Sequence, residues 1–585
     1  MHACTRDCYD TCIFDDSHKP IKDFPTLGFT CSRGNMDLKR NDKNRILNAY
    51  IEGKEADIKE AVREIARIIN GTSKDEILHV DYDGNQGLLT WYFPARLWNA
   101  LGTVSTDYSI CSAEGHNAIK LHYGSSLGAL PEDFIKAKAV VFWGSEAAFS
   151  FIHGWKLLAN KRKVTIDVRL SETAKRSDRV YIIKPSSDAF LALGIIKYLI
   201  ELGLENPLID DLQALQDYVR AYDWELIENT TGLKKEEIKE LSIFYKEEKP
   251  LTIIGFALGR TYNGGHAISL ISLIPALIGL RYGFYYSNSQ GFNIDFEYLR
   301  GYHLSKPSRI VNMGKIWKEV EEGKIKVIFT WNANPYHSLP RWDVIREKVE
   351  EGEVKLIVHD PFWSETAKIA NIVIPAPTYL EKYDVVYSYW HDYLIYNEPI
   401  RDAKGIDEVR LMRMIAEELR LRHPLIEEDE WDAVDRAISK TGISLEELRQ
   451  KKVVKIKNLN RGYQVAKVLP LPNLTPPPND DYYLVFSSHP NHTNSQFKEL
   501  FNTEPIVYNC CFDGTGFLEN EKGRVKVIFR KSEGVPKNVL FMFKSSLIDL
   551  EGKPINSICN DTSNEYGKTP QLNATIIRKV IIDKN

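Results

Sequence analysis

From about residue 56 to residue 376, short runs of β-branched and aromatic residues alternate with stretches of helical periodicity. The strand-like runs include ILHVDY (77–82), AVVFWG (139–144) and KVIFTW (326–331), and DAFLALGIIKYLIEL (188–202) is one of the helical stretches. This alternation is typical of βαβ units with parallel strands. Because the runs are too many for one sheet, the sequence predicts two α/β domains.

The pattern changes after residue 405. Residues 405–450 are charged and helical, and Ser444 with Glu447 forms a capping-box signal that predicts a helix start. LPLPNLTPPP (469–478) is rich in proline and predicts a stiff linker. The sequence after this segment has strand-like runs and little helical periodicity, which predicts a C-terminal β domain, most simply a barrel.

The 585-residue composition is that of a soluble globular protein, with 43% hydrophobic and 27% charged residues. A formal net charge of -4 gives no basic field for nucleic acid. The most apolar stretch, Ile268 to Leu280, is too short to cross a bilayer. The start, MHACTRDCYD, carries no signal-peptide pattern. We therefore expect a cytoplasmic protein with no membrane insertion.

Four of the eight cysteines lie in the first 31 residues: Cys4, Cys8, Cys12 and Cys31. Four thiolates are the usual ligands of a 4Fe–4S cluster, and three close cysteines with a distant fourth suit such a cluster. A structural zinc is the alternative, although zinc sites favour two separate Cys-x2-Cys pairs. A disulfide scaffold is not expected in so large a chain without a secretory signal. Cys510, Cys511 and Cys559 show no metal-ligand spacing.

Cys111 stands alone in DYSICSAEGHNAIKLHYG (107–124), just before residues of helical character. A helix N-terminus lowers the pKa of a thiol, and a soft thiolate suits molybdenum or tungsten. The alternative is a buried structural cysteine. Glu114, His116 and His122 are candidates for proton transfer by proximity alone.

Polar loops follow several predicted strands, at the edge where open α/β sheets bind ligands. DGNQG offers Gly84 and Gly87 for close approach to phosphates, and Ser145 and Asp167 follow two further strands. The chain has no GxGxxG, so a nicotinamide or flavin site of the Rossmann type is not supported.

CTRDCYDTC (4–12) followed by FTCSRG (29–34) resembles the iron–sulfur segment of the molybdopterin oxidoreductases, the dimethyl sulfoxide reductase superfamily. The resemblance implies a molybdenum or tungsten bis(pyranopterin guanine dinucleotide) cofactor beside a 4Fe–4S cluster. It places Arg33 between cluster and pterin, and Cys111 at the position of the protein ligand to the metal. The gap before Cys31 is shorter than is common in the family. The residue after Cys111 is Ser112, where formate dehydrogenases of this family have His, and this argues against formate.

The resemblance also implies which loops hold the two dinucleotides. In the first half, IDVRLSET and KPSSD match family motifs, with Asp167 and Asp188 as partners of a guanine edge. Departures from the family pattern are Glu146, Ser186 and Asn371. The cofactor-binding residues so implied are Gly84, Gly87, Ser145, Asp167, Arg169, Thr173, Asp188, Asn332, Asn334, Asp360, Thr366, His492, Asn494, Asn556 and Asn573.

We expect four domains: an iron–sulfur domain (1–50), a discontinuous α/β domain (51–95 and 296–465), an inserted α/β cofactor-binding domain (96–295) and a C-terminal β-barrel domain (470–585). The expected function is two-electron oxygen-atom or hydride-type transfer at the metal, with the cluster relaying electrons. Cys111, Arg33 and His116 are the expected catalytic residues. The expected partners are a small-molecule substrate and a redox protein.

Two alternatives stay open. One is a non-redox reaction on the same scaffold, a hydration or a hydroxyl transfer. The other is an electron-transfer subunit without the metal cofactor, which the presence of Cys111 and of the loop motifs argues against.

Overall fold

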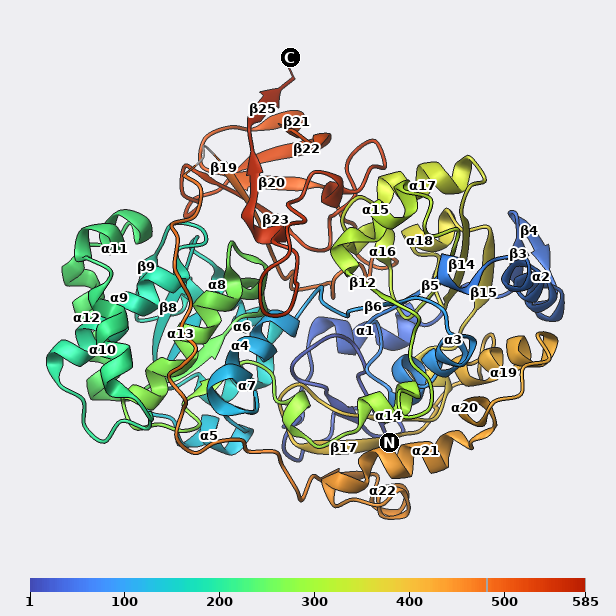
Figure 1. Cartoon of the computed structure of the whole chain (residues 1–585), viewed down its shortest axis with the longest axis horizontal. Coiled ribbons are helices and arrows are strands. Elements are labelled where there is room, and N and C mark those ends of the chain that lie inside the picture. The colour runs from blue at the N-terminus through green and yellow to red at the C-terminus, as the bar shows by residue number, and fades with distance from the viewer. Residues whose placement is uncertain (480–481, 584–585) are drawn as a thin grey trace. The chain divides into compact units, whose positions relative to one another are not determined.

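The computed structural model describes residues 1–479 and 482–583, and the chain forms two compact units. Unit 1 comprises Met1–Tyr108, Phe292–Leu459 and Asn491–Thr503, and unit 2 comprises Ser109–Gly291, Asn460–Pro490 and Glu504–Asn585. Each unit contains a parallel sheet with helices (Figure 1). The predicted α/β class is confirmed, and the four domain boundaries stay a prediction.

The sheet of unit 1 has six strands in the order β4-β3-β15-β14-β13-β5. β5, β13, β14 and β15 are parallel, β3 pairs antiparallel with β15, and β4 pairs antiparallel with β3. Their bounds are β5 Ile77–Asp81, β13 Val327–Trp331, β14 Lys355–Asp360, β15 Ile372–Pro375, β3 Ala49–Ile51 and β4 Lys54–Ala56. The parallel strands are buried almost throughout, which is why they read as continuous apolar runs.

The helices of unit 1 follow the predicted periodicity. α2 (Ile58–Asn70) starts at Asp57, whose side chain accepts from the Lys59 N–H, and it packs on α19 (Glu408–Glu418). Ser444 precedes α22 (Leu445–Lys451), and its hydroxyl accepts from the Glu447 N–H at 3.1 Å. The predicted helix start at Ser444 is therefore confirmed.

The first sheet of unit 2 has five parallel strands in the order β11-β10-β7-β8-β9. They are β7 Ala139–Trp143, β8 Arg162–Asp167, β9 Arg179–Ile182, β10 Leu251–Ile254 and β11 Phe284–Tyr285. Helix α13 (Gly264–Leu277) is buried at every residue and packs against α9 (Asp188–Leu202) and α4 (Ala113–Tyr123). Among the described residues, no helix has the length and apolarity to span a bilayer.

The apolar run LTIIGFALG (251–259) is a strand only in its first half. β10 ends at Ile254, and residues Phe256–Arg260 form a 3-10 turn instead. The chain leaves the sheet at Gly255, where a Cβ atom would stand 1.9 Å from the Gly144 carbonyl oxygen. Only glycine permits so close an approach between two backbone segments.

Unit 2 also holds a seven-stranded sheet in the order β24-β19-β23-β20-β22-β21-β25, nearly closed and barrel-like (Figure 1). Its strands are β19 Tyr482–Ser487, β20 Ile506–Asn509, β21 Gly514–Asn520, β22 Gly523–Lys531, β23 Val539–Phe543, β24 Thr575–Ile577 and β25 Lys579–Ile582. This sheet confirms the predicted C-terminal β architecture.

The proline-rich segment is fixed to unit 2 by two tyrosines. Tyr218 donates to the Pro472 carbonyl oxygen at 2.6 Å, and Tyr222 accepts from the Leu474 N–H at 3.0 Å. The segment has no helix or strand, but it lies along the protein and is not a free spacer.

Candidate functional site

The N-terminal cysteines lie around a short hairpin in unit 1. β1 (His2–Ala3) pairs antiparallel with β2 (Ile13–Phe14), and the Cys4 N–H donates to the Cys12 carbonyl oxygen at 2.8 Å. Cys31 caps α1 (Ser32–Arg40).

Cys4 and Cys12 are buried, Cys8 and Cys31 are half-buried, and charged side chains lie near them. Burial raises the pKa of Cys4 to about 12. Burial raises the pKa of Cys8 as well, and the nearby Asp10, Cys4 and Cys31 raise it further. Burial would also raise the pKa of Cys31, but Arg33 and Arg6 outweigh it and hold the value below the ordinary range. Thiolates buried together need a cationic centre to stabilise them, so this donor set suits a soft metal cluster.

The cysteines do not, however, form a closed ligand set. Within residues 1–479 and 482–583, no three His, Cys, Asp or Glu side chains stand in an arrangement able to hold a metal ion. Ligation of a cluster by Cys4, Cys8, Cys12 and Cys31 therefore stays a prediction.

Arg33 joins the cysteine segment to the segment 491–503. Its Nε donates to Cys31 Sγ at 3.4 Å, and its Nη1 donates to the His492 carbonyl oxygen at 3.0 Å and to the Thr493 hydroxyl at 3.1 Å. Asn494 donates to Asp7 at 2.9 Å. The structure thus brings Arg33, His492 and Asn494 together, although His492 takes part through its backbone.

Cys111 lies in unit 2, directly before Ser112, the N-cap of α4. It is 9% exposed. Arg260 donates to Cys111 and to the residue before it. Its Nη2 donates to Cys111 Sγ at 3.2 Å, and its Nε donates to the Ile110 carbonyl oxygen at 3.1 Å. A thiol at a helix start with a guanidinium against its sulfur is favoured as a thiolate.

The acid–base candidates near Cys111 have structural partners. Glu114 accepts from the Tyr566 and Gly567 N–H groups. Burial lowers the pKa of His116 to about 3, and its Nδ1 lies 2.7 Å from the Ser126 hydroxyl. His122 bridges the Lys467 carbonyl and the Ser269 hydroxyl. His116 is therefore a neutral imidazole, and its catalytic role stays a prediction.

The loop after β7 is held by Glu146. Its Oε1 accepts from the Thr173 N–H (2.9 Å) and hydroxyl (2.8 Å), and its Oε2 accepts from Arg169 at 3.0 Å. Arg169 also stacks on Phe541, 3.8 Å from the ring centroid. Arg169 and Thr173, predicted to bind the cofactor, are thus already partners of the family-atypical Glu146.

Two aspartates follow strands of unit 2: Asp167 ends β8 and is half-buried, and Asp188 begins α9 and is buried. Burial raises the pKa values of Asp167 and Asp188 to about 6, and Asp188 accepts from Trp143 Nε1 at 2.9 Å. Ser145 is buried beside Glu146. Ser186 takes a left-handed φ of 63°, the conformation for which the glycine of the related family motif is suited.

Unit 1 repeats this arrangement around Asn334. Its Oδ1 accepts from the Thr366 N–H (3.2 Å) and hydroxyl (2.7 Å), and its Nδ2 donates to Glu365 (2.7 Å) and Ser495 (3.0 Å). At the end of β14, burial raises the pKa of Asp360 to about 7.

The loop after β5 packs against the cysteine segment. The Gln86 N–H donates to the Thr5 carbonyl oxygen at 2.7 Å. Around Gly84 and Gly87 the space is filled by protein: a Cβ would stand 2.8 Å from the Asn332 carbonyl oxygen in one case and 2.0 Å from the Asp384 carboxylate in the other. Asn332 also donates to the Asn85 carbonyl oxygen at 2.8 Å.

Asp83, in the same loop, is 3% exposed, and neither carboxylate oxygen has a hydrogen-bond partner among the described residues. A buried carboxyl with both oxygens free is costly unless a bound group supplies donors. The N–H edge of a pterin or guanine is such a donor group. The residues present therefore fit the implied cofactor at this loop.

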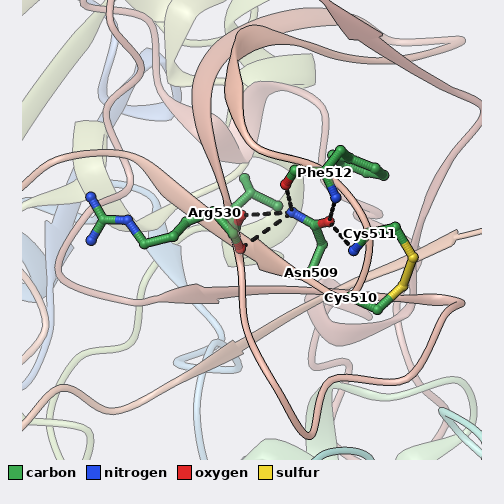
Figure 2. The surroundings of a disulfide bond; sticks show 6 residues. Asn509, Cys510, Cys511, Phe512 and Arg530 are labelled. Carbon is green, nitrogen blue, oxygen red and sulfur yellow. Dashed lines mark hydrogen bonds between the residues drawn. A yellow bond between two sulfur atoms is a disulfide. The ribbon is translucent and has the colours of Figure 1, made fainter.

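The terminal sheet contributes two predicted residues and a disulfide. Asn573 accepts from the Phe486 N–H at 3.1 Å, and Asn556 is buried in a 3-10 turn. Cys510 and Cys511 form a disulfide after β20. Figure 2 shows how the Asn509 side chain fixes this turn, accepting from the Cys511 and Phe512 N–H groups, both at 2.8 Å. This bond joins neighbouring residues and is no disulfide scaffold.

Sequence reasoning missed Asp83 and Arg260. Asp83 is the first residue of the DGNQG loop already singled out, and its carboxylate at a strand end was a usable signal. Arg260 is far from Cys111 in the chain, and no spacing rule connects them.

Comparisons with known proteins place the chain in a family. The molybdopterin oxidoreductase family model matches residues 58–392. Probable oxidoreductase YoaE of Bacillus subtilis (strain 168) is 28% identical over 460 residues, which cover 71% of this chain and 68% of the relative. The assimilatory nitrate reductase catalytic subunit of the same strain is 26% identical over 254 residues, 37% of this chain and 36% of its own length.

The fold is similar to that of the acetylene hydratase from Pelobacter acetylenicus, with a TM-score of 0.76. The match covers 95% of this chain and 94% of that chain at 15% sequence identity. This likeness concerns the fold alone.

Proposed function

Because the chain belongs to the molybdopterin oxidoreductase family, we propose that it is a molybdenum- or tungsten-dependent enzyme of two-electron oxygen-atom or hydride-type transfer. The observation that carries the proposal is Cys111, a buried thiol at the start of α4 with the Arg260 guanidinium 3.2 Å from its sulfur. Such a group is a soft, anionic metal ligand.

A bis(pyranopterin guanine dinucleotide) centre would supply the two-electron chemistry. The residues proposed to hold it are those predicted from the sequence, with Asp83 added. Asp83 and Asp188 are buried and Asp167 is half-buried, and their carboxyls are suited to N–H donors of the pterin or guanine. Glu146 and Asn334 fix the loops through Thr173 and Thr366.

We further propose that Cys4, Cys8, Cys12 and Cys31 bind a 4Fe–4S cluster that relays electrons to a redox partner. Arg33 supports this role, because its guanidinium donates to Cys31 Sγ and is itself held by the His492 carbonyl. A fixed cation beside the cluster stabilises added negative charge and raises its reduction potential.

Elemental and cofactor analysis of the purified protein tests the proposal. We expect about four irons per chain, molybdenum or tungsten, and guanosine monophosphate released on acid hydrolysis. Zinc in place of iron would contradict the cluster. Iron without molybdenum, tungsten or pterin would favour an electron-transfer subunit.

Cys111→Ala tests the metal ligand. We expect loss of activity with unchanged iron, and a metal X-ray absorption spectrum with less sulfur scattering than the wild type. Asn509→Ala is the control, because it disturbs the Cys510–Cys511 turn and leaves Cys111 in place. A wild-type enzyme that turns over substrate with no electron acceptor or donor would instead favour a hydration or hydroxyl transfer.

A further inference from the structure

Three side chains fix the backbone around Cys111 in unit 2. Arg260 donates to the Ile110 carbonyl oxygen, the Tyr286 hydroxyl donates to the Ser112 carbonyl oxygen at 3.1 Å, and Glu114 is bound to the Tyr566 and Gly567 N–H groups. Of these three side chains, Arg260 also donates to Cys111 Sγ, at 3.2 Å. The guanidinium therefore acts on both the turn and the thiol.

Arg260 is itself held in place on both sides. It ends the 3-10 turn Phe256–Arg260, and the Asn564 side chain donates to the Gly259 carbonyl oxygen at 2.8 Å and to the Thr261 carbonyl oxygen at 3.0 Å. A Cβ atom at Gly259 would lie 3.8 Å from the Cys111 carbonyl oxygen, so the two turns are packed directly together. The position of the guanidinium is thus set by the backbone of its own turn.

The contacts of Arg260 need a planar group with several N–H donors, which arginine has and lysine does not. Two donors of one planar group reach the Ile110 carbonyl and the Cys111 sulfur at once. A lysine ammonium is a point charge on a flexible stem and cannot hold both acceptors in one fixed orientation. Hydrogen bonds to ligand sulfurs withdraw electron density and tune the potential of a metal centre.

We propose that Arg260 is a positioning residue for the metal centre: it orients Cys111 and, by donating to its sulfur, raises the reduction potential of the metal. This inference rests on the proposed function, in which Cys111 ligates molybdenum or tungsten. Arg260 touches the ligand and not the reacting atoms.

The test is an EPR-monitored redox titration of the holoenzyme, with X-ray absorption at the metal edge. Arg260→Gln and Arg260→Met both remove the charge, and both should shift the metal midpoint potential downward while iron and metal contents stay the same. Arg260→Lys should recover part of the shift, because it restores the charge without the two-donor geometry.

Arg281→Gln is the matched control. Arg281 is also a buried arginine of unit 2, and it donates to two carbonyl oxygens away from the Cys111 turn, those of Tyr463 and Arg461. Its replacement should leave the metal midpoint unchanged.

A wild-type midpoint in both Arg260→Gln and Arg260→Met would overturn the inference. So would the loss of metal from both variants while Arg281→Gln retains it, because Arg260 would then be needed for binding and not for tuning. Identical metal X-ray absorption spectra for the wild type and Cys111→Ala would instead contradict the proposed function itself. The two failures are therefore distinguishable.

Discussion

The two units carry the same pentapeptide, SETAK, at residues 171–175 and 364–368, and fold it in the same way. Ser171 and Ser364 each cap a four-residue helix, α8 (Glu172–Lys175) and α18 (Glu365–Lys368). In each, the threonine donates its N–H and its hydroxyl to one side-chain oxygen from the preceding strand end.

That oxygen belongs to a carboxylate in unit 2 and to an amide in unit 1. Glu146 is charged and is neutralised by Arg169, whereas Asn334 uses its amide hydrogens to bind Glu365 and Ser495. The comparison shows that the loop shape depends on one acceptor atom. Whether that atom belongs to a charged or a neutral side chain goes with its other partners, which are Arg169 in unit 2 and Glu365 and Ser495 in unit 1. The predictions below exchange or remove these features.

Asn334→Asp should have the largest effect. It places a carboxylate at the 2.7 Å contact with Glu365, where the amide now donates. Burial would raise the pKa of Glu365, but His337, Lys498 and Asn334 outweigh it and hold the value at about 2, so the residue is ionised. We expect a loss of about 4 kcal/mol in local stability at neutral pH, measured by hydrogen exchange of the α18 amides.

The same variant should regain stability as the pH falls, since two adjacent carboxylates can share a proton. Exchange of the α8 amides is the internal control and should not change. Equal exchange rates in wild type and variant at α18 would show that Ser495 and Lys498 absorb the new charge.

Glu146→Gln should cause the next largest loss of local stability. The variant keeps an oxygen for Thr173 but removes the ion pair with Arg169, whose side chain is 11% exposed and lies on the Phe541 ring. A buried cation left without its partner costs about 3 kcal/mol. The loss should appear as faster exchange at α8 and not at α18. A double variant with Arg169→Met should recover much of it, and failure to recover would mean that the ion pair is not the cause.

Replacing each of the two threonines by valine should show how much more a hydrogen bond to a charged acceptor stabilises the protein than one to a neutral acceptor. Thr173→Val removes a hydroxyl that donates to a carboxylate, and Thr366→Val removes one that donates to an amide oxygen. We expect losses of about 2 and about 1 kcal/mol, because hydrogen bonds to charged groups are the stronger. The thermal midpoint of each purified variant checks the order, and a larger loss for Thr366→Val would reverse the comparison.

The sequence predicts the sheets well and this loop pair only in part. β5, β7 and β13 are found within a residue of the runs predicted for them, because parallel strands are buried on both faces and therefore have continuous apolar sequences. The cysteine cluster and Cys111 are visible from spacing and isolation. The partner of Glu146 could not be predicted, since Arg169 comes from a different strand end and the choice among nearby cations depends on packing. Asp83 and Arg260 were missed for the same reason.

The smallest effect concerns two aspartates at equivalent strand ends, Asp360 after β14 and Asp167 after β8. Burial raises the pKa of Asp360 to about 7 and that of Asp167 to about 6, against about 3.9 in an unfolded chain. The folded protein therefore binds a proton more tightly than the unfolded chain does. Each group's contribution to stability is complete below about pH 4 and is lost as the pH rises to the folded pKa.

Between pH 6 and pH 7, Asp360 should contribute most of the slope, because the Asp167 carboxyl is already about half ionised at pH 6. Asp360→Asn should therefore flatten the fall of the thermal midpoint over that interval more than Asp167→Asn does. One unit of pKa corresponds to about 1.4 kcal/mol. Midpoints measured from pH 4 to pH 8 for both variants and the wild type decide the matter. Identical slopes for the two variants above pH 6 would mean that the two strand ends bury their carboxyls equally.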